Sequence, residues 1–563
     1  MLRNPTNRTR TRRLVSAAAV TATALLLGAC SGAANGGQPA AKDASITVAA
    51  GDITTKNFNP FSSTALQSTL GVIYEPLYWY NFAKQSDPTP VLATGYSWNA
   101  AGTELTIKLR HDVKWNDGQP FTAKDVAFTF NLVAKTPALN PSGLAATASA
   151  AADDTAVLTF KSKSLMQEPA VLANQAIVPE HIWKDIKDPT TNLNDNPVGT
   201  GPFKLKSFTP QSYVLTKNDQ YWEAGKPTVK EVRYIPLQSA DAASAALVAG
   251  KVDWASAYLP GIDNIMKSSK DLTYVNTPVM TTVIVTCANS GLGCAGPQTD
   301  PAVRKAINLA MNREQLAKLA GGGVAGVGSP TLLLPGRDDD WIADSGSAKL
   351  PQSASADEAN KLLDAAGWTK GSDGVRTKAG KRLSLTIQTV TGWSDYILIN
   401  DTLKQQLAAI GIELKPSQVS WNEWNAAQTN GKFQLSLDSV GLGASTNPYF
   451  TYNSKLATPN TAPVGKSASA GNQSRFSDPA VDAALTTAAG TTDAAVQKAE
   501  YGKIQAVIED QLPYIPVYVN SMLTEFNTSR ATGWPTKDNP YVLPAAWKAW
   551  DAGIVLKTIT PAK

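Results

Sequence analysis

The hydrophobic pattern of the chain predicts an alternation of strands and helices. Residues 383–390 alternate apolar and polar side chains, which is the two-residue period of a strand. Apolar residues then recur at helical spacing over 397–410, and 412–414 begin another strand. A strand, a helix and a strand joined by short turns predict two parallel strands with a right-handed crossover. The class is therefore α/β.

Helix start signals at other points of the chain support this class. Asp300 followed by Pro301 combines an N-cap residue with proline in the first turn. Thr122 stands three residues before Asp125, as in a capping box. The Ala- and Ser-rich stretch 137–155 instead predicts a surface connection, and residues 514–519 predict an apolar strand near the C-terminus.

The first 29 residues have the pattern of an export signal. Five arginines and no acidic residue precede Cys30, with the small and apolar run 14–29 between them. This run of 16 residues falls short of the roughly 20 apolar residues that span a bilayer, so a cleaved signal is favoured over an uncleaved anchor. The pair Arg12-Arg13 leaves twin-arginine export as an alternative to the general route.

The sequence Leu27-Gly28-Ala29-Cys30 resembles the bacterial lipobox. The resemblance implies that residues 1–29 are removed and that Cys30 carries a lipid at the outer face of the cytoplasmic membrane. Residues 30–44 are small and polar, and predict a flexible tether to the folded body.

Length and charge narrow the class of protein. The chain has 563 residues, more than a single core usually serves, which predicts more than one lobe. It carries 51 Lys and Arg against 46 Asp and Glu, and five of the arginines precede Cys30. The remainder is therefore neutral, which argues against nucleic acid as a partner.

Catalytic and metal-binding motifs are missing from the sequence. Only His111 and His181 are present, and no metalloprotease, nucleophile-elbow, P-loop or dinucleotide motif occurs in its required context. Cys287 and Cys294, seven residues apart, predict a disulfide in an exported chain. We therefore expect a binding protein with no enzymatic activity, metal or cofactor.

A set of motifs in consistent order resembles the extracellular solute-binding proteins of family 5, the dipeptide and oligopeptide receptors of ABC importers. The similarity covers about residues 45–555. The motifs are Pro90–Ala93 continuing through Lys114–Pro120 to Phe130, Gly199–Phe203, Asn218–Trp222, Gly250–Trp254, Val303–Ile307 with Asn312–Glu314, and Leu362–Trp368.

This resemblance implies a two-lobed periplasmic-binding-protein-like fold of type II, cluster C. Lobe 1 would comprise 45–285 and 515–563, with an extra subdomain near 85–195, and lobe 2 would comprise 286–514. The lobes would close over a small-molecule ligand, and the closed monomer would dock on permease subunits coupled to ATPase subunits.

Candidate ligand-binding residues follow from a rule for open α/β sheets, in which ligands lie beyond the carboxyl ends of strands. Polar and aromatic residues are found at several such predicted ends, and one further tryptophan lies in a family motif. Core packing is the alternative for any single tryptophan. The candidates are Asn57, Asn59, Trp254, Trp393, Tyr396, Trp421, Trp424, Asn447 and Tyr449.

The ligand class depends on charge. Peptide receptors of the family commonly place an Asp in the loop that corresponds to 440–448, and this loop contains no carboxylate. A buried ammonium without a counter-charge is costly. The segment Gly533–Tyr541 resembles the oligosaccharide-binding branch of the family. We therefore expect a short, β-linked oligosaccharide, with an oligopeptide or dipeptide as the alternative and a secreted hydrolase as a more distant one.

Overall fold

The fold is organised around a ten-stranded sheet in the order β17-β16-β18-β12-β19-β11-β1-β10-β9-β8. The computed structural model describes residues 45–562, except 52, 141–142, 238, 258, 260, 345–348, 442 and 469–470. The predicted signal peptide, Cys30 and the tether lie outside the described residues. Smaller sheets are β4-β5-β7-β6, β13-β14-β15, β2-β3 and β20-β21.

The strands are β1 (Ser45–Ala50), β2 (Tyr78–Trp79), β3 (Thr89–Pro90), β4 (Ala93–Trp98), β5 (Glu104–Leu109), β6 (Ala146–Ala152), β7 (Thr155–Phe160), β8 (Phe203–Thr209), β9 (Ser212–Lys217), β10 (Glu231–Pro236), β11 (Trp254–Ala255), β12 (Leu272–Thr286), β13 (Thr369–Lys370), β14 (Arg376–Lys378), β15 (Lys381–Arg382), β16 (Ser384–Val390), β17 (Glu413–Val419), β18 (Leu435–Val440), β19 (Tyr514–Asn527), β20 (Ala531–Thr532) and β21 (Thr560–Pro561).

The α-helices are α1 (Ala123–Lys135), α2 (Glu168–Leu172), α3 (Glu180–Trp183), α4 (Ala240–Val248), α5 (Ile262–Met266), α6 (Pro301–Ala310), α7 (Arg313–Leu319), α8 (Ala356–Ala365), α9 (Ser394–Ala408), α10 (Trp421–Asn430), α11 (Pro448–Leu456), α12 (Pro479–Ala489), α13 (Ala494–Gln511) and α14 (Asp551–Thr558). Among described residues, no helix is both long enough and apolar enough to cross a membrane.

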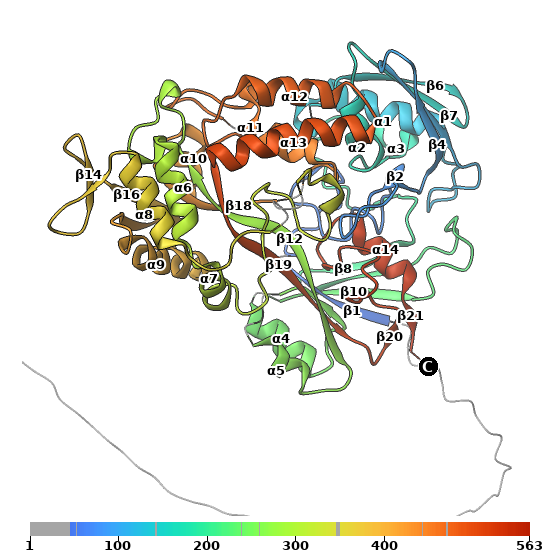
Figure 1. The fold of residues 1–563 in the computed structure, drawn as a ribbon. Coiled ribbons are helices and arrows are strands. Elements are labelled where there is room, and N and C mark those ends of the chain that lie inside the picture. The colour runs from blue at the N-terminus through green and yellow to red at the C-terminus, as the bar shows by residue number, and fades with distance from the viewer. Residues whose placement is uncertain are drawn as a thin grey trace, which may run out of the picture. The chain divides into compact units, whose positions relative to one another are not determined.

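Two long strands, β12 and β19, join the two halves of the main sheet. They pair antiparallel over almost their whole length, and in Figure 1 they cross the middle of the drawing. One end of β12 pairs with β18 through Thr281–Thr286, and one end of β19 pairs with β11 through Glu525 and Phe526. The ladder shifts register between Pro278 and Met280, so the ribbon is bulged near its middle.

The half that contains β16 is doubly wound, and the predicted parallel pair β16–β17 is part of it. β16 pairs parallel with β17 on one side and with β18 on the other. Because β16, β17 and β18 follow one another in the chain, the connection through α9 leads outward and the connection through α10 returns across β16. Right-handed crossovers of opposite direction place the two helices on opposite faces of the sheet.

The half that contains β1 also has a parallel centre. β1 pairs parallel with β10 and with β11, and β9 and β8 extend the sheet antiparallel. The sheet β4-β5-β7-β6 is separate and packs against α1. The prediction that 137–155 is a surface connection is wrong for residues 146–152, which form the strand β6. Its side chains are small and mostly exposed, so alanine and serine hide an edge strand from a hydrophobicity pattern.

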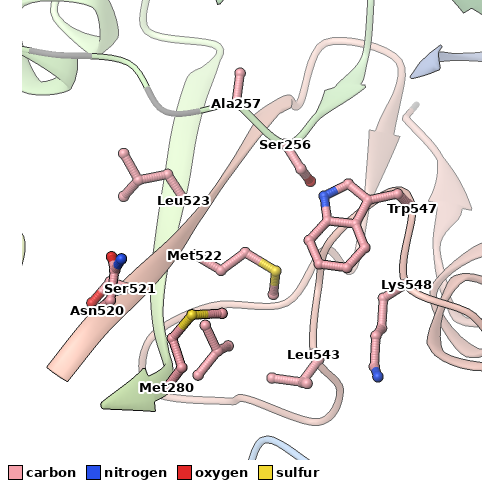
Figure 2. Close-up of a pocket in the computed structure, with 11 residues that line it drawn as sticks. Ser256, Ala257, Met280, Asn520, Ser521, Met522, Leu523, Leu543, Trp547 and Lys548 are labelled. Atoms are coloured by element: carbon pink, nitrogen blue, oxygen red, sulfur yellow. The ribbon is translucent and has the colours of Figure 1, made fainter. Parts of the chain in front are cut away.

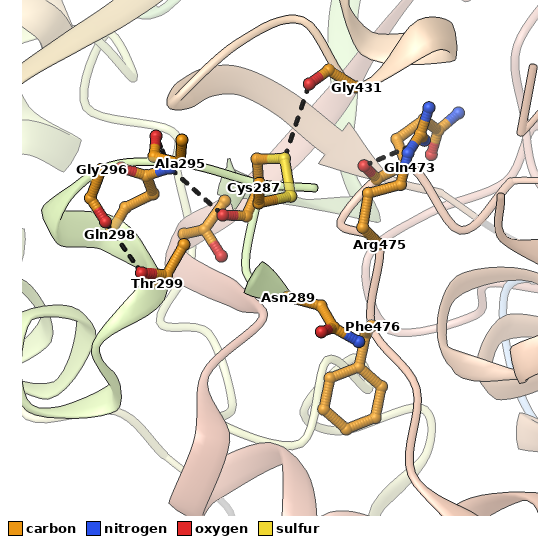
Figure 3. Close-up of a disulfide and its surroundings, with 12 residues drawn as sticks. Cys287, Asn289, Ala295, Gly296, Gln298, Thr299, Gly431, Gln473, Arg475 and Phe476 are labelled. Atoms are coloured by element: carbon orange, nitrogen blue, oxygen red, sulfur yellow. Dashed lines mark hydrogen bonds between the residues drawn. A yellow bond between two sulfur atoms is a disulfide. The ribbon is translucent and has the colours of Figure 1, made fainter. Parts of the chain in front are cut away.

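Buried apolar side chains form separate cores in the two halves. The largest surrounds β1 and β10 and extends to α14, and two others lie on β12, β16, β18 and β19 with the helices of residues 301–511. The predicted disulfide between Cys287 and Cys294 is present (Figure 3). Cys287 lies 3.5 Å from the carbonyl oxygen of Gly431, so the bridge holds the loop after β12 against the end of α10.

Candidate ligand-binding site

The carboxyl ends of both parallel groups of strands point at the bulged middle of the β12–β19 ribbon. β11 runs antiparallel to β19, as β12 does, so β11 and β12 share one direction. β18 runs antiparallel to β12 and therefore opposite to β11. The end of β11 at Ala255 and the end of β18 at Val440 thus face each other along the ribbon.

The register gives the separation of these two ends. Ala255 is level with Glu525, which pairs with Tyr274, whereas Val440 pairs with Thr281. The two levels are seven residue steps apart along β12, which at about 3.3 Å per residue is roughly 20 Å. This separation matches the length of a ligand several units long.

A cavity of about 430 Å³ occupies the ribbon side of this region (Figure 2). Its floor is the bulged section of β12 and β19, and its walls come from the segment after β11 and from residues 543–548. A second cavity of about 630 Å³ shares Ser256, Ala257 and Trp547 with it and lies at the carboxyl ends of β1, β10 and β11. The first cavity is lined by Ser256, Ala257, Val279, Met280, Asn520, Ser521, Met522, Leu523, Leu543, Trp547 and Lys548.

Trp547 is the exposed aromatic side chain of this site. It lines both cavities and leaves 54% of its surface exposed, whereas most large apolar residues of the chain are buried. In Figure 2 its indole ring stands opposite Ser256 and above the thioethers of Met280 and Met522. An exposed indole beside apolar and hydroxyl groups offers a flat face and a free N–H to a ligand.

The charges of the site are one-sided. Lys548 is the cationic residue of the lining, and none of the described residues that line the two shared cavities carries a carboxylate. The Lys548 ammonium also lies over the ring of Phe82, 5.0 Å from its centroid. The lining therefore offers no counter-charge to a bound ammonium group.

Two buried carboxyl groups support the walls from behind. The Ala257 amide donates to Glu525 Oε2 over 3.2 Å, and the Leu543 amide donates to Asp551 Oδ1 over 3.2 Å. Burial raises the pKa of Glu525 to about 8. Burial also raises the pKa of Asp551 to about 7, although the Lys548 ammonium acts in the opposite direction. Both groups hold main-chain N–H groups of lining residues in place.

Three predicted site residues come together at the end of β16. The ring of Trp393 packs edge-on against Tyr396 with centroids 5.4 Å apart and against Trp424 with centroids 5.2 Å apart. The Tyr396 hydroxyl bonds to the Ser439 hydroxyl of β18. We call Trp393, Tyr396 and Trp424 the β16-end cluster. Trp421 begins the same helix as Trp424 but is 54% exposed, whereas Trp424 is buried.

Four other predicted residues form structural contacts away from the shared cavities. Trp254 is fully buried, donates to the carbonyl of Pro544 and packs on Trp534. Asn57 and Asn59 follow β1 as expected, but their side chains bond to loop 57–64 and to carbonyls of Pro189 and Asn192. Asn447 caps α11 and also bonds to Gln497 and Tyr501.

Tyr449 lies in a different hollow. It is half-buried and lines a cavity of about 590 Å³ together with Lys163, Asn453 and residues of α12. Ligand contact by any of the nine candidates stays a prediction.

One glutamine connects the predicted subdomain to the predicted second lobe. Gln85 accepts a hydrogen bond from the Thr446 hydroxyl over 2.8 Å and donates to the Thr446 carbonyl over 3.1 Å. It also donates to Asp338 over 3.2 Å. Nearby, Asn174 donates to the carbonyl of Ala444 over 3.1 Å. The loop after β18 is thus held by polar groups from the other half of the chain.

Sequence reasoning missed the residues of the shared cavities. Ser256, Met280, Met522, Trp547 and Lys548 lie outside the predicted strands and motifs, and the topology of β12 and β19 brings them together. A usable signal was Trp547 followed directly by Lys548, because a tryptophan beside a charged residue is a candidate for an exposed position. Within the described parts, no group of three or more His, Cys, Asp or Glu could hold a metal ion.

Comparison with known proteins identifies the family. The model for bacterial extracellular solute-binding proteins, family 5 Middle, matches residues 87–462. The chain belongs to this family. A putative ABC transporter peptide-binding protein of Brucella ovis is 28% identical over 484 residues, covering 82% of this chain and 84% of the relative. A glutathione-binding protein of Salmonella choleraesuis is 25% identical over 530 residues, covering 89% and 94%.

Solved structures agree with this assignment. The periplasmic oligopeptide-binding protein of an oligopeptide ABC transporter from Thermotoga maritima is 26% identical, with a TM-score of 0.81, covering 92% of this chain and 99% of that chain. A mannohexaose-bound structure of the same protein is 25% identical, with a TM-score of 0.74 and the same coverage. The fold is therefore the two-lobed type II fold of this family.

The family assignment defines the general role of the chain. It is the extracellular or periplasmic substrate-binding protein of an ABC importer, which receives a small-molecule ligand and works with permease and ATPase subunits. Its relatives are solute-binding proteins and not enzymes.

Proposed function

We propose that this solute-binding protein captures a short, neutral oligosaccharide, with β-linked sugars as the leading class. The observation that carries the proposal is the lining of the shared cavities: an exposed Trp547 above apolar side chains, with hydroxyl and amide groups and no carboxylate among the described lining residues. Sugar rings present apolar faces that stack on an indole, and their hydroxyls bond to groups such as Ser256 and Asn520.

Charge is the main argument against a peptide. The free amino group of a peptide needs a carboxylate partner when it is removed from water. Glu525 and Asp551 lie behind the walls of the cavity, where they accept hydrogen bonds from the main-chain amides of Ala257 and Leu543. Burial raises the pKa of both groups and so favours their neutral forms, which give no charge to pair with an ammonium group. The mannohexaose-bound relative is a precedent for a sugar in a family member named for oligopeptides.

An oligopeptide is the second candidate, and one contact favours it. Lys548 lies in the lining, where its ammonium would pair with the carboxylate of a peptide. The names of the Brucella and Salmonella relatives also point to peptides or glutathione. The two candidates predict opposite results for the same binding panel.

The surroundings of the site complete the proposal. The ligand lies on a lobe 1 of residues 45–285 and 515–563, which supplies the described residues that line the shared cavities, and a lobe 2 of residues 286–514 closes over it. The subdomain near 85–195 contributes Gln85, which bonds to Thr446 and Asp338 of lobe 2. Cys30 anchors the monomer to the outer face of the cytoplasmic membrane after removal of residues 1–29. Mass spectrometry of protein from membranes tests the anchor, because it reports the mass of lipid on the first residue.

A thermal-shift panel tests the ligand class. Residues 31–563 are titrated with β-linked oligosaccharides of two to six units and with di- to pentapeptides, including glutathione. A ligand that binds only the folded chain stabilises it by about 2.7 kcal/mol at a hundredfold excess over its Kd. We expect shifts with sugars and none with peptides, and Trp547→Ala should remove them.

The same panel can also contradict the oligosaccharide proposal. Shifts with peptides alone would overturn the oligosaccharide proposal, and Lys548→Met should then weaken peptide binding while Trp547→Ala has the smaller effect. Trp341→Ala is the matched control for loss of an indole, because Trp341 packs on Tyr501 away from the shared cavities.

A further inference from the structure

Tyr396, the member of the β16-end cluster that belongs to α9, lies over the same face of the sheet as the floor of the Trp547 cavity. Met280, on that floor, and Thr282 are two residues apart in an unbroken stretch of register, so their side chains share a face. Thr282 pairs with Ser439, and paired residues of neighbouring strands point to one side of a sheet. Tyr396 bonds to Ser439 and therefore lies over that side.

The distance from the floor to the cluster follows from the strand order. β18 and β16 are the next two strands beyond β12, and two strand spacings are about 10 Å. β16 and β18 are paired parallel, with Gln388 level with Ser436. The chain that leaves β16 toward Trp393 therefore leaves the sheet at the same edge as the chain that leaves β18 at Val440.

The topology gives the cluster the position where this class of sheet binds ligands. The chain passes from β16 to β17 on one side and returns to β18 on the other, so the strand order reverses at β16. Ligands of open α/β sheets bind outside the carboxyl ends at such a reversal. Trp393 follows the end of β16 directly and is half-buried, which leaves part of its ring accessible.

We propose that the β16-end cluster is the far subsite of an extended ligand track that begins in the Trp547 cavity, and that it selects for the chain length of the ligand. The inference rests on the proposed oligosaccharide function. A short sugar occupies the Trp547 cavity alone. A longer one crosses the roughly 10 Å over β12 and β18 and adds a stacking contact on Trp393.

Titration calorimetry with a ladder of β-1,4-linked glucose and mannose oligosaccharides of two to six units tests this inference. The proteins are the wild type, Trp393→Leu, Trp393→Phe, Trp547→Leu and the control Trp341→Leu. Trp341 matches Trp393, since each is half-buried and packs edge-on against a tyrosine, at 5.6 Å for Trp341. Binding of the disaccharide reports whether each variant keeps a working cavity.

The inference predicts a change that depends on ligand length. Wild-type affinity should rise with the chain length of the sugar. Trp393→Leu should weaken binding of the longest sugars about tenfold and leave the affinity for the disaccharide unchanged. Trp393→Phe should restore most of that gain because an aromatic face returns. Trp547→Leu should weaken every length, and Trp341→Leu should weaken none.

Two results would overturn the inference while leaving the proposed function intact. Either Trp393→Leu changes no affinity, or it lowers all lengths equally, as a general loss of folding would. Failure of the wild type to bind any sugar would instead overturn the proposed function, and the inference with it.

Discussion

Replacing Glu525 by glutamine should make the stability of the protein less dependent on pH. The folded chain holds this carboxyl without contact to water, with one oxygen bonded to the Ala257 amide and the other without a partner among the described residues. Burial raises its pKa from 4.5 to about 8. Glutamine has nearly the same shape, keeps an acceptor for Ala257 and cannot ionise.

The sign follows from proton binding. Between pH 4.5 and 8 the unfolded chain has released the proton that the folded chain still holds, so the free energy of unfolding falls as pH rises through this window. A difference of about 3.5 pKa units lowers the free energy of unfolding by about 5 kcal/mol once the pH is above 8, and by nothing at pH 4. Glu525→Gln should therefore match the wild type at pH 5 and exceed it at pH 8.5.

Differential scanning calorimetry between pH 5 and 9 measures this effect. Unfolding entropy is about 2.1 cal/mol/K per residue, so roughly 500 residues that unfold together convert about 5 kcal/mol into a Tm difference of about 5 °C. A lobe that unfolds by itself would show a larger shift. Glu314→Gln, which removes an exposed carboxyl in the first turn of α7, is the control. A difference between variant and wild type that is the same at every pH would refute the reasoning.

Three further predictions concern other parts of the molecule. Gln85→Ala removes the hydrogen bonds to Thr446 and Asp338, each worth about 0.5–1.5 kcal/mol. The radius of gyration in small-angle scattering should therefore increase and ligand affinity should fall about tenfold. Exposed Gln211→Ala is the control, and unchanged scattering for Gln85→Ala would contradict the prediction. Replacing Cys287 and Cys294 by alanine opens a loop of eight residues. The free energy of unfolding in denaturant titrations should fall by about 2.5 kcal/mol, and ligand affinity should not change. Equal stability of variant and wild type would contradict a stabilising role of the disulfide. Trp254→Ala should lower the free energy of unfolding by about 3–5 kcal/mol in the same titrations, since Trp254 is a core residue. A loss of ligand affinity without a loss of stability would instead show that Trp254 contacts the ligand.

Strand and helix patterns predicted the α/β part of the fold well where one face of each element is buried. The unit β16-α9-β17 and the caps at Thr122 and Asp300 agree with the structure because periodicity and capping are local properties. β19 was predicted only to residue 519, although it continues to Asn527. Its later part contains Ser521, Thr524 and Glu525, and their burial depends on partners far away in the chain.

The candidate site was predictable to the extent that it depends on strand ends. Trp393, Tyr396 and Trp424 were expected after β16 and β17, and they are in contact. The Trp547 cavity was not predictable, because it exists only where the bulge of β12 meets β19 and the segment after β11. Conversely, Trp254 lies in a family motif but fills the core. Residue type alone does not distinguish a buried indole from one that binds ligand.

The most direct test of the central claim is hydrogen exchange of the whole chain with and without the oligosaccharide that binds most tightly in the panel. The account predicts slower exchange in 256–257, 279–280, 520–523 and 543–548, which line the Trp547 cavity, and in 391–396 for the longer sugars. Protection that is confined to other surfaces, such as the hollow between Lys163 and Tyr449, would contradict the placement of the ligand at the middle of the β12–β19 ribbon.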